Sequence, residues 1–280
     1  MLVFEKIISI KKHISELKEA KKTIGFVPTM GALHNGHISL INKAKKENNI
    51  VVSSIFINPT QFNDKSDFEK YPRTLETDKE ILEKANCDII FAPSKEEMYP
   101  EPDNSKFDFG NLDKVMEGNF RPGHFKGVAI IVKKLLKIIE PHRAYFGEKD
   151  YQQFLIIKKL TSILNLPIQI IGCPTIRESD GLAMSSRNTR LSNKERADAV
   201  KVSQILLEIK QLKGKMSVDE MIFFVENEIK KIPLLKLEYF EIADNTTLLP
   251  VKNWHNYEDT MAFIAFYAGK IRLIDNVKFI

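Results

Sequence analysis

Residues 23–37 read Thr23-Ile24-Gly25-Phe26-Val27-Pro28-Thr29-Met30-Gly31-Ala32-Leu33-His34-Asn35-Gly36-His37. The segment opens with a short apolar run, residues 23–27, that predicts a buried strand ended by Pro28. Helical periodicity follows over residues 36–47, with apolar side chains at Ile38, Leu40, Ile41 and Ala44. A strand that passes through a loop of small residues into a helix is typical of the first unit of a parallel α/β sheet.

The same alternation continues through the first 175 residues. Short apolar segments predict further strands over residues 50–56, 88–93, 143–146 and 168–171. Between them, the helical spacing of apolar side chains predicts helices over residues 74–85, 125–139 and 151–164. Strands that alternate with helices predict an α/β fold, here a Rossmann-like parallel sheet with helices on both faces.

The pattern changes after Asp180. Helices are predicted over residues 193–210 and 218–231, and strands over residues 236–243, 260–268 and 270–274. Helices followed by adjacent strands indicate a smaller α+β domain at the C-terminal end. Pro174 and the polar stretch 177–181 interrupt the periodicity, so we place the domains at residues 1–175 and 176–280.

Composition narrows the class of protein. The 280 residues are 43% hydrophobic and 28% charged, as in an ordinary globular protein. Cys87 and Cys173 lie in apolar contexts without the spacing of a zinc or redox site, which indicates buried thiols in a reducing compartment. The N-terminus lacks the order of a signal peptide, and no apolar run approaches membrane-spanning length. We therefore expect a cytoplasmic protein with no membrane partner.

The formal net charge is +5, which could indicate an anionic partner. The lysines are scattered along helix-like surfaces, however, and no basic run is interleaved with aromatic residues as it would be in a nucleic-acid groove. We therefore expect no nucleic acid partner.

The loop that links the first strand to its helix carries candidate catalytic residues. Ligands of open α/β sheets bind at the carboxyl ends of strands, where helix N-termini present free N–H groups. Residues 30–32 include the small residues that let backbone approach a phosphate, and His34 and His37 could both face one phosphoryl group. The alternative is a tight turn with a capping Asn35 and two solvated histidines. A zinc pair lacks a third ligand, so we predict no metal-binding residues here.

Two further segments also follow predicted strands. In residues 56–62, Gln61 can both donate and accept hydrogen bonds, although an ordinary Asn-Pro turn accounts for the segment equally well. In residues 147–153, Lys149 offers a positive charge for a phosphate, and Asp150 can accept from a ribose hydroxyl or lie over a metal ion. Asp150 could also be the N-cap residue of the following helix, and the two roles could hold at once.

At the predicted domain boundary, residues 184–187 read Met-Ser-Ser-Arg and form either a clamp suited to a triphosphate or a solvated loop. Together with the histidine loop, this segment resembles the HIGH and KMSKS elements of the nucleotidylyltransferase superfamily. The closer resemblance is to the pantothenate synthetase (pantoate–β-alanine ligase) family, and it covers nearly the whole chain. The matching segments are residues 28–37, 56–62, 71–74, 121–125, 146–153, 180–188 and 272–276.

The resemblance implies an ATP-dependent, AMP-forming carbon–nitrogen ligase that acts in two steps in pantothenate and coenzyme A biosynthesis. The carboxylate of pantoate would attack the α-phosphate of ATP and give pantoyl adenylate and diphosphate. The amine of β-alanine would then attack the acyl carbon and release AMP and pantothenate. The resemblance also implies Mg²⁺ with the ATP phosphates, a homodimer, and a C-terminal domain that closes over the site as a lid.

Carried over residue by residue, the resemblance assigns roles to the matched positions. His34, His37, Lys149 and Arg187 would be catalytic, with His37 as the proton donor. The residues that would bind ATP are Met30, Gly31, Ala32, Leu33, His34, Asn35, Gly36, His37, Gly147, Glu148, Lys149, Asp150, Ile176, Met184, Ser185, Ser186 and Arg187. Gln61 and Gln153 would bind pantoate, and Gln61 would also contact β-alanine. The chain departs from the family pattern at Ile57, Lys126 and His142, where valine, arginine and aspartate are common.

Two other classes of function remain open at this point. A different nucleotidylyltransferase, acting on a phosphate acceptor, would keep the His-x-Gly-His loop of residues 34–37 but would not need the pair Gln61 and Gln153. A non-catalytic nucleotide- or RNA-binding module would need a basic face and would tolerate the loss of His37.

Overall fold

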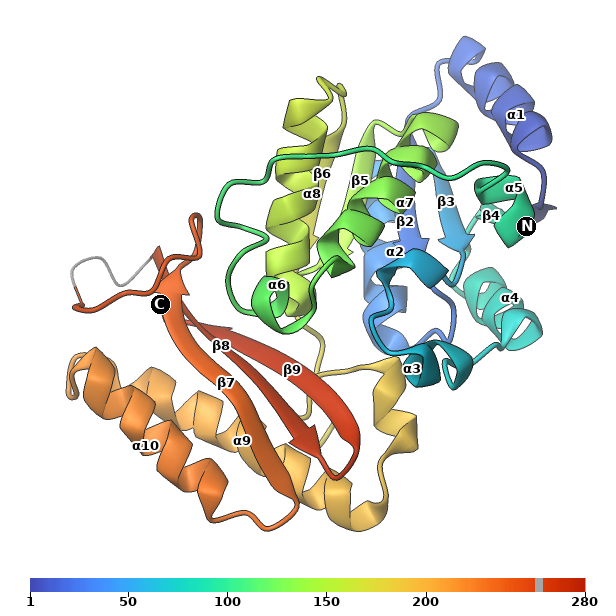
Figure 1. Cartoon of the computed structure of the whole chain (residues 1–280). Coiled ribbons are helices and arrows are strands. Elements are labelled where there is room, and N and C mark those ends of the chain that lie inside the picture. The colour runs from blue at the N-terminus through green and yellow to red at the C-terminus, as the bar shows by residue number, and fades with distance from the viewer. Residues whose placement is uncertain (255–258, 280) are drawn as a thin grey trace.

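Six strands pair in parallel to form one sheet in the computed structural model, which describes residues 1–254 and 259–279 (Figure 1). The strands are β1 (Leu2–Phe4), β2 (Ile24–Thr29), β3 (Ile50–Ile55), β4 (Ile89–Phe91), β5 (Arg143–Gly147) and β6 (Gln169–Cys173). Their order is β1-β4-β3-β2-β5-β6, so the strands that follow β2 wind outward in both directions. A topological switch point therefore lies between β2 and β5, where open α/β sheets bind ligands.

Helices cover both faces of this sheet, because successive residues of each strand point to opposite sides. Phe26 packs with α1, α7 and α8 in one buried cluster, and its neighbour Val27 packs with α2 and α4 in another. The α/β class expected from the sequence is therefore confirmed. The helices of this part are α1 (Ile7–Glu19), α2 (Asn35–Glu47), α3 (Lys65–Glu69), α4 (Leu75–Lys84), α5 (Lys95–Met98), α6 (Glu117–Phe120), α7 (His124–Ile139) and α8 (Tyr151–Ile163).

The C-terminal part is a three-stranded antiparallel sheet with two helices packed on one face (Figure 1). Apolar residues of both helices and all three strands form a buried cluster of their own. The α+β character expected for this part is confirmed. Its elements are α9 (Asn193–Leu212), α10 (Val218–Lys230), β7 (Leu235–Asp244), β8 (Thr260–Ala268) and β9 (Ile271–Lys278), preceded by the 3₁₀ turn η3 (Ser186–Arg190).

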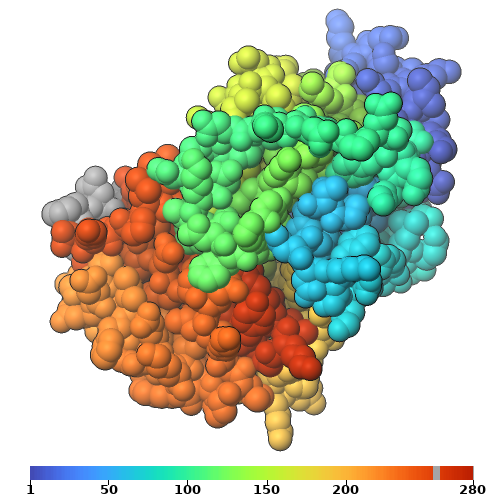
Figure 2. Space-filling model, in the orientation of Figure 1, coloured from blue at the N-terminus to red at the C-terminus, as the bar shows by residue number. Residues whose placement is uncertain are grey.

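The two parts pack directly against each other. Met261 and Phe263 of β8 form a small apolar cluster with Met116, which precedes α6, and with the start of α8. In the space-filling view, the green segment before α7 lies against the orange and red C-terminal part (Figure 2). The C-terminal sheet also contacts residues 148–150, directly after the carboxyl end of β5, through β9.

Some predicted boundaries were wrong. β2 does not end before Pro28 but runs through it to Thr29. At Pro28 the ladder is made with β3, whereas β5 pairs only at Gly25 and Phe26, so the missing N–H of proline breaks no pairing on the β5 side. β9 extends four residues beyond its predicted end at residue 274, to Lys278. The elements β1, α1, α3, α5 and α6 were not predicted.

Candidate active site

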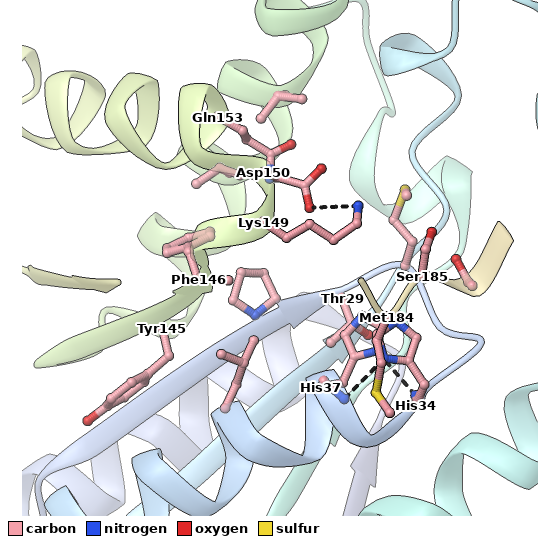
Figure 3. Close-up of a pocket in the computed structure, with 18 of the residues that line it drawn as sticks. Thr29, His34, His37, Tyr145, Phe146, Lys149, Asp150, Gln153, Met184 and Ser185 are labelled. Carbon is pink, nitrogen blue, oxygen red and sulfur yellow. Dashed lines mark hydrogen bonds and ion pairs between the residues drawn. The ribbon is translucent and has the colours of Figure 1, made fainter. Parts of the chain in front are cut away.

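A cavity of about 230 Å³ opens at the carboxyl ends of β2 and β5, at the switch point of the sheet. Pro28 and Thr29 from the end of β2 form one part of its wall, and Phe146 and Gly147 from the end of β5 form another. The close-up shows Lys149 and Asp150 on one side, with His34, His37 and Met184 facing them (Figure 3). Residues from three distant segments, 28–37, 146–150 and 184, thus meet around one cavity.

His34 and His37 hold the start of α2 through their own ring nitrogens. The Gly36 N–H donates to Nδ1 of His34 at 3.1 Å, and the His34 N–H donates to Nδ1 of His37 at 3.3 Å. His34, not Asn35, is therefore the N-cap of α2, which corrects the predicted alternative of a capping asparagine with two solvated histidines. A Cβ on Gly36 would lie 2.8 Å from the His34 ring, so this arrangement requires glycine at position 36.

These bonds determine where the imidazole protons lie. A backbone N–H can only donate, so Nδ1 of both rings must accept, and the proton of each neutral ring is on Nε2. Burial, and then the positive charge of Lys149, lower the pKa of His34 to about 4. Burial, His34 and Lys149 lower the pKa of His37 to about 3. Both rings are therefore neutral near pH 7 and present Nε2–H donors.

The loop before α2 is fixed by Asp78, a buried carboxylate of α4. Asp78 accepts from the backbone N–H groups of Ala32 and Leu33 at 2.9 and 2.8 Å, and from the Thr74 hydroxyl at 3.2 Å. Gly31 and Ala32 both take positive φ, at 80° and 52°. The N–H groups of residues 32 and 33 are thus occupied by protein, and no local sequence pattern indicated this partner.

The opposite wall comes from the turn η2 (Glu148–Asp150), between β5 and α8. The Lys149 side chain is only 16% exposed, and its ammonium lies 3.9 Å from the Asp150 carboxylate. Asp150 is the N-cap residue of α8, as the sequence allowed, but its side chain makes no capping hydrogen bond. Lys149 therefore brings a largely desolvated positive charge to the cavity that the two histidines also line.

Gln61 and Gln153 line the same cavity. The amide of Gln61 donates to the sulfur of Met30 at 2.9 Å, and its oxygen accepts from Asn58 at 3.1 Å. Asn58 is itself buried and caps the short turn η1 (Pro59–Gln61). The predicted Asn-Pro turn is therefore formed, and it places Gln61 on the wall of the cavity.

The Met-Ser-Ser-Arg segment closes another side of the cavity. Ser185 caps η3 by accepting from the Arg187 N–H, and the Ser186 hydroxyl lies 3.1 Å from the Tyr71 hydroxyl. The Arg187 guanidinium donates to Asp67 at 2.7 Å. The segment is therefore held in place against α3 and is not a solvated loop.

Comparisons with known proteins agree on one family. The Pantoate-beta-alanine ligase family model matches residues 2–278. The chain belongs to the pantoate–β-alanine ligase family. Pantothenate synthetase from Bacteroides fragilis is 50% identical over 279 residues, spanning 100% of this chain and 99% of the relative. Membership confirms the enzyme class expected from the sequence, an AMP-forming ligase of pantoate and β-alanine, over another nucleotidylyltransferase.

Solved structures of this ligase family share the fold. Pantothenate synthetase from Thermus thermophilus superimposes with a TM-score of 0.93 at 39% identity, covering 100% of this chain and 99% of that one. The pantoate–β-alanine ligase from Francisella tularensis, solved with β-γ ATP and β-alanine, gives a TM-score of 0.83 at 38% identity. That match covers 99% of this chain and 97% of the other. The Rossmann-like fold expected from the sequence is thus confirmed.

The structure brings most of the predicted site residues of this ligase to one cavity. Those that line it are Met30, His34, Gly36, His37, Gln61, Gly147, Lys149, Asp150, Gln153, Ile176, Met184, Ser185, Ser186 and Arg187. Predicted ATP-binding residues that do not line it are Gly31, Ala32, Leu33, Asn35 and Glu148. The lining residues Asn58 and Tyr71 were not given a role, although both lie within segments that matched the family.

His142, one of the positions where the chain differs from the family pattern, lies away from the cavity. Nδ1 of His142 accepts from the Ile24 N–H at 3.0 Å, at the amino end of β2, whereas the cavity lies at the carboxyl end. The substitution at this position therefore does not touch the site.

No metal cluster accompanies the site. Within residues 1–254 and 259–279, no group of three or more His, Cys, Asp or Glu side chains is arranged to hold a metal ion. In the same described ranges, no helix has the length and apolar character needed to cross a bilayer. Cys87 and Cys173 are buried free thiols, as predicted.

Proposed function

We propose that the chain condenses pantoate with β-alanine in this cavity through a pantoyl-adenylate intermediate. A pantoate carboxylate oxygen attacks the α-phosphorus of ATP, and the bond to the diphosphate oxygen breaks. The β-alanine amine then attacks the acyl carbon, the bond to the AMP oxygen breaks, and the amine loses a proton. The observation that carries this proposal is the convergence of two neutral histidine donors, Lys149 and the two glutamines on one cavity.

His34, His37 and Lys149 form the phosphate end of the proposed site. Negative charge builds on the phosphate oxygens as diphosphate leaves, and preorganised donors stabilise that charge. The Nε2–H groups of the histidines and the Lys149 ammonium meet this requirement without a change of protonation. In this proposal His37 acts as a hydrogen-bond donor to phosphate, which refines the proton-donor role expected from the sequence. Arg187 and the serines beside it contact the same phosphates.

Gln61 and Gln153 bind pantoate in this proposal. Each amide can donate to the pantoate carboxylate and accept from a hydroxyl group, which suits a hydroxy acid. Gln61 also contacts β-alanine. The nucleotide then lies along residues 147–150 and against Ile176, with the remaining predicted ATP-binding residues, Gly31, Ala32, Leu33, Asn35 and Glu148, supporting the cavity from behind.

Mg²⁺ would enter with the ATP phosphates. Magnesium sites of this type use one or two carboxylates together with phosphate oxygens and water, so a dedicated protein cluster is not required. Asp150 lines the cavity with a half-exposed side chain and would hold the ion. The ion would neutralise phosphate charge when bound.

We also propose the domain division at residues 175 and 176. Separate buried apolar clusters before and after this boundary support the division. Positions 255–258 and 280 of the second domain lie outside the described residues. A homodimer, with the C-terminal domain acting as a lid and contributing to association, follows from the family resemblance. Sedimentation would test the dimer. A cytoplasmic location fits an enzyme that consumes ATP.

Isotope transfer tests the adenylate. Pantoate labelled with ¹⁸O in its carboxylate is incubated with ATP, Mg²⁺ and β-alanine, and the AMP is analysed by mass spectrometry. The proposal expects one ¹⁸O atom in the AMP, because the attacking oxygen stays with the phosphate. AMP without label would show that pantoate never attacks the α-phosphorus and would overturn the proposal.

A further inference from the structure

The segment 272–276 of β9 matches the family but lies outside the roles assigned so far. Its polar residues reach three different parts of the first 177 residues. Arg272 donates to both carboxylate oxygens of Glu117, and Arg177 donates to both of Asp275. Asn276 reaches the turn η2, which carries Lys149. One strand of the C-terminal sheet thus contacts three segments of the first 177 residues, and one of them, η2, lines the cavity.

The side chain of Asn276 contacts η2 only through backbone carbonyl groups of that turn. Its amide nitrogen donates to the carbonyl of Glu148 at 2.9 Å and to the carbonyl of Lys149 at 2.8 Å. Asn276 is 7% exposed, so water does not substitute readily for either bond. Both N–H groups of the amide therefore donate hydrogen bonds to the two residues that precede Asp150.

The backbone of Asn276 is itself fixed from the other side. Its N–H donates to Asp275 at 2.8 Å, and its carbonyl accepts from Arg177 at 3.4 Å. Asp275 is buried and paired bidentately with Arg177 at 2.7 and 3.0 Å. Asn276 thus links η2 to a rigid ion pair instead of to a mobile surface group.

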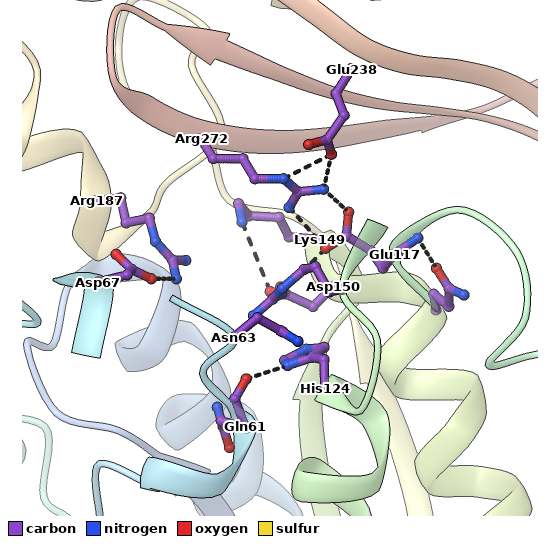
Figure 4. A network of polar contacts seen from close by, with 12 residues as sticks. Gln61, Asn63, Asp67, Glu117, His124, Lys149, Asp150, Arg187, Glu238 and Arg272 are labelled. Carbon is purple, nitrogen blue, oxygen red and sulfur yellow. Dashed lines mark hydrogen bonds and ion pairs between the residues drawn. The ribbon is translucent and has the colours of Figure 1, made fainter. Parts of the chain in front are cut away.

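Lys149 is the side chain that this link would position. Its ammonium extends into the cavity toward Met184 and Ser185 (Figure 3), and in Figure 4 it lies between Arg272 and Asp150. The positive charge of Lys149 disfavours a second positive charge nearby and so lowers the pKa of both His34 and His37. A shift of the η2 backbone would move this charge relative to the histidine donors, and catalysis is sensitive to displacements of about 1 Å.

We propose that Asn276 is a positioning residue for the ligase reaction: it holds the backbone of η2 so that the Lys149 ammonium faces the phosphate end of the cavity. This inference rests on the proposed role of Lys149. Only a side chain with two N–H donors on one atom makes both bonds, whereas aspartate would place acceptors against acceptors. The C-terminal sheet thereby contributes to the active site without touching substrate.

A double-mutant cycle tests this inference. The kcat for AMP formation is measured for the wild type, Asn276→Ala, Lys149→Ala and the double variant. Loss of positioning should lower kcat by about tenfold or more in Asn276→Ala. In the Lys149→Ala background the same change should cost less than about twofold, because the positioned group is gone. Equal losses in both backgrounds would overturn the inference, since Asn276 would then act independently of Lys149.

Two controls make the cycle decisive. Asn48→Ala removes another buried amide, one that donates to the Ala44 carbonyl and to the Tyr145 hydroxyl. Asn48 itself does not line the cavity. Its effect on kcat should be equal in the two backgrounds. Melting curves identify unfolded variants, and Asn276→Ser replaces Asn276→Ala in the cycle if the latter does not fold. Wild-type kcat in Lys149→Ala would instead refute the proposed role of Lys149 itself.

Discussion

The guanidinium of Arg187 donates to the carboxylate of Asp67 at 2.7 Å, although 120 positions separate the two residues. Arg190 donates to the second oxygen of the same carboxylate, also at 2.7 Å. A second contact, 3.1 Å between the hydroxyls of Tyr71 and Ser186, lies nearby. Helix α3 is therefore joined to the Ser-Ser-Arg segment at the edge of the cavity (Figure 4).

Replacing Asp67 by asparagine should weaken ATP binding. Asp67 accepts from one NH₂ group of Arg187, so loss of this charge-assisted bond should leave mobile a side chain that we propose contacts phosphate. We expect the KM for ATP to rise about tenfold, the scale of one hydrogen bond to a charged group. Glu69→Gln, an exposed change on the same helix, is the matched control and should leave this KM unaltered. An unchanged KM in Asp67→Asn would show that Arg187 needs no anchor.

The histidine pair should show no ionisation near its ordinary pKa of 6.5. Because the folded-state pKa values are lowered to about 4 and about 3, both rings stay neutral as the pH falls from 8 to 5. Long-range ¹H–¹⁵N NMR spectra should show the proton on Nε2 of both rings, with Nδ1 unprotonated. A step in kcat near pH 6.5 that disappears in His37→Ala would contradict this assignment.

The two glutamines should act on pantoate more than on ATP. Gln61→Ala and Gln153→Ala each remove hydrogen bonds expected to reach the hydroxy acid, so the KM for pantoate should rise about tenfold in each. The KM for ATP should change much less. Gln211→Ala, an exposed change on α9, serves as the control. Unaltered pantoate KM values in both variants would count against the assignment.

Glu117 should contribute strongly to stability. Burial alone would raise its pKa, but hydrogen bonds and charge attraction from Arg272 outweigh this and lower the pKa to about 2. Glu117→Gln leaves Arg272 under-compensated and should lower the free energy of unfolding by about 3–5 kcal/mol in denaturant titrations. Glu76→Gln, on an 81% exposed side chain, should change it by less than about 0.5 kcal/mol.

The same lowered pKa fixes a pH dependence. Glu117 is charged in the folded state above about pH 2, so its stabilisation is present above the ordinary glutamate value of 4.5 and is lost as the pH falls toward 2. The wild type should therefore lose more stability over this range than Glu117→Gln does. An equal loss in both proteins would show that the Arg272 pair does not stabilise the fold.

Local pattern was sufficient to predict most of the fold. The apolar pattern predicted β8 at residues 260–268, the bounds that the structure has, because the β-branched and aromatic residues of this segment favour a strand. Pro28 misled the prediction, since only the sheet order shows that its missing N–H is harmless. β1 was missed because three residues at an edge carry too little periodicity.

Contacts within the site were harder to predict than its residues. His34 and His37 were found because they lie three positions apart at a strand end. Asp78 and Asp67 were not, because their contacts with the histidine loop and with the Ser-Ser-Arg segment join residues 45 to 123 positions apart. Asn276 lies in a matched segment, yet nothing local indicates that its amide would reach Lys149. Side chains that position other groups leave no local signal.

The AMP assay tests the central claim most directly. Purified protein is incubated with ATP, Mg²⁺ and pantoate, with or without β-alanine, and AMP and pantothenate are quantified by chromatography. We expect sustained AMP formation, equimolar with pantothenate, only when both pantoate and β-alanine are present. In His37→Ala, kcat should be lower by about a hundredfold. No AMP with both acids present, or wild-type turnover in His37→Ala, would contradict the account.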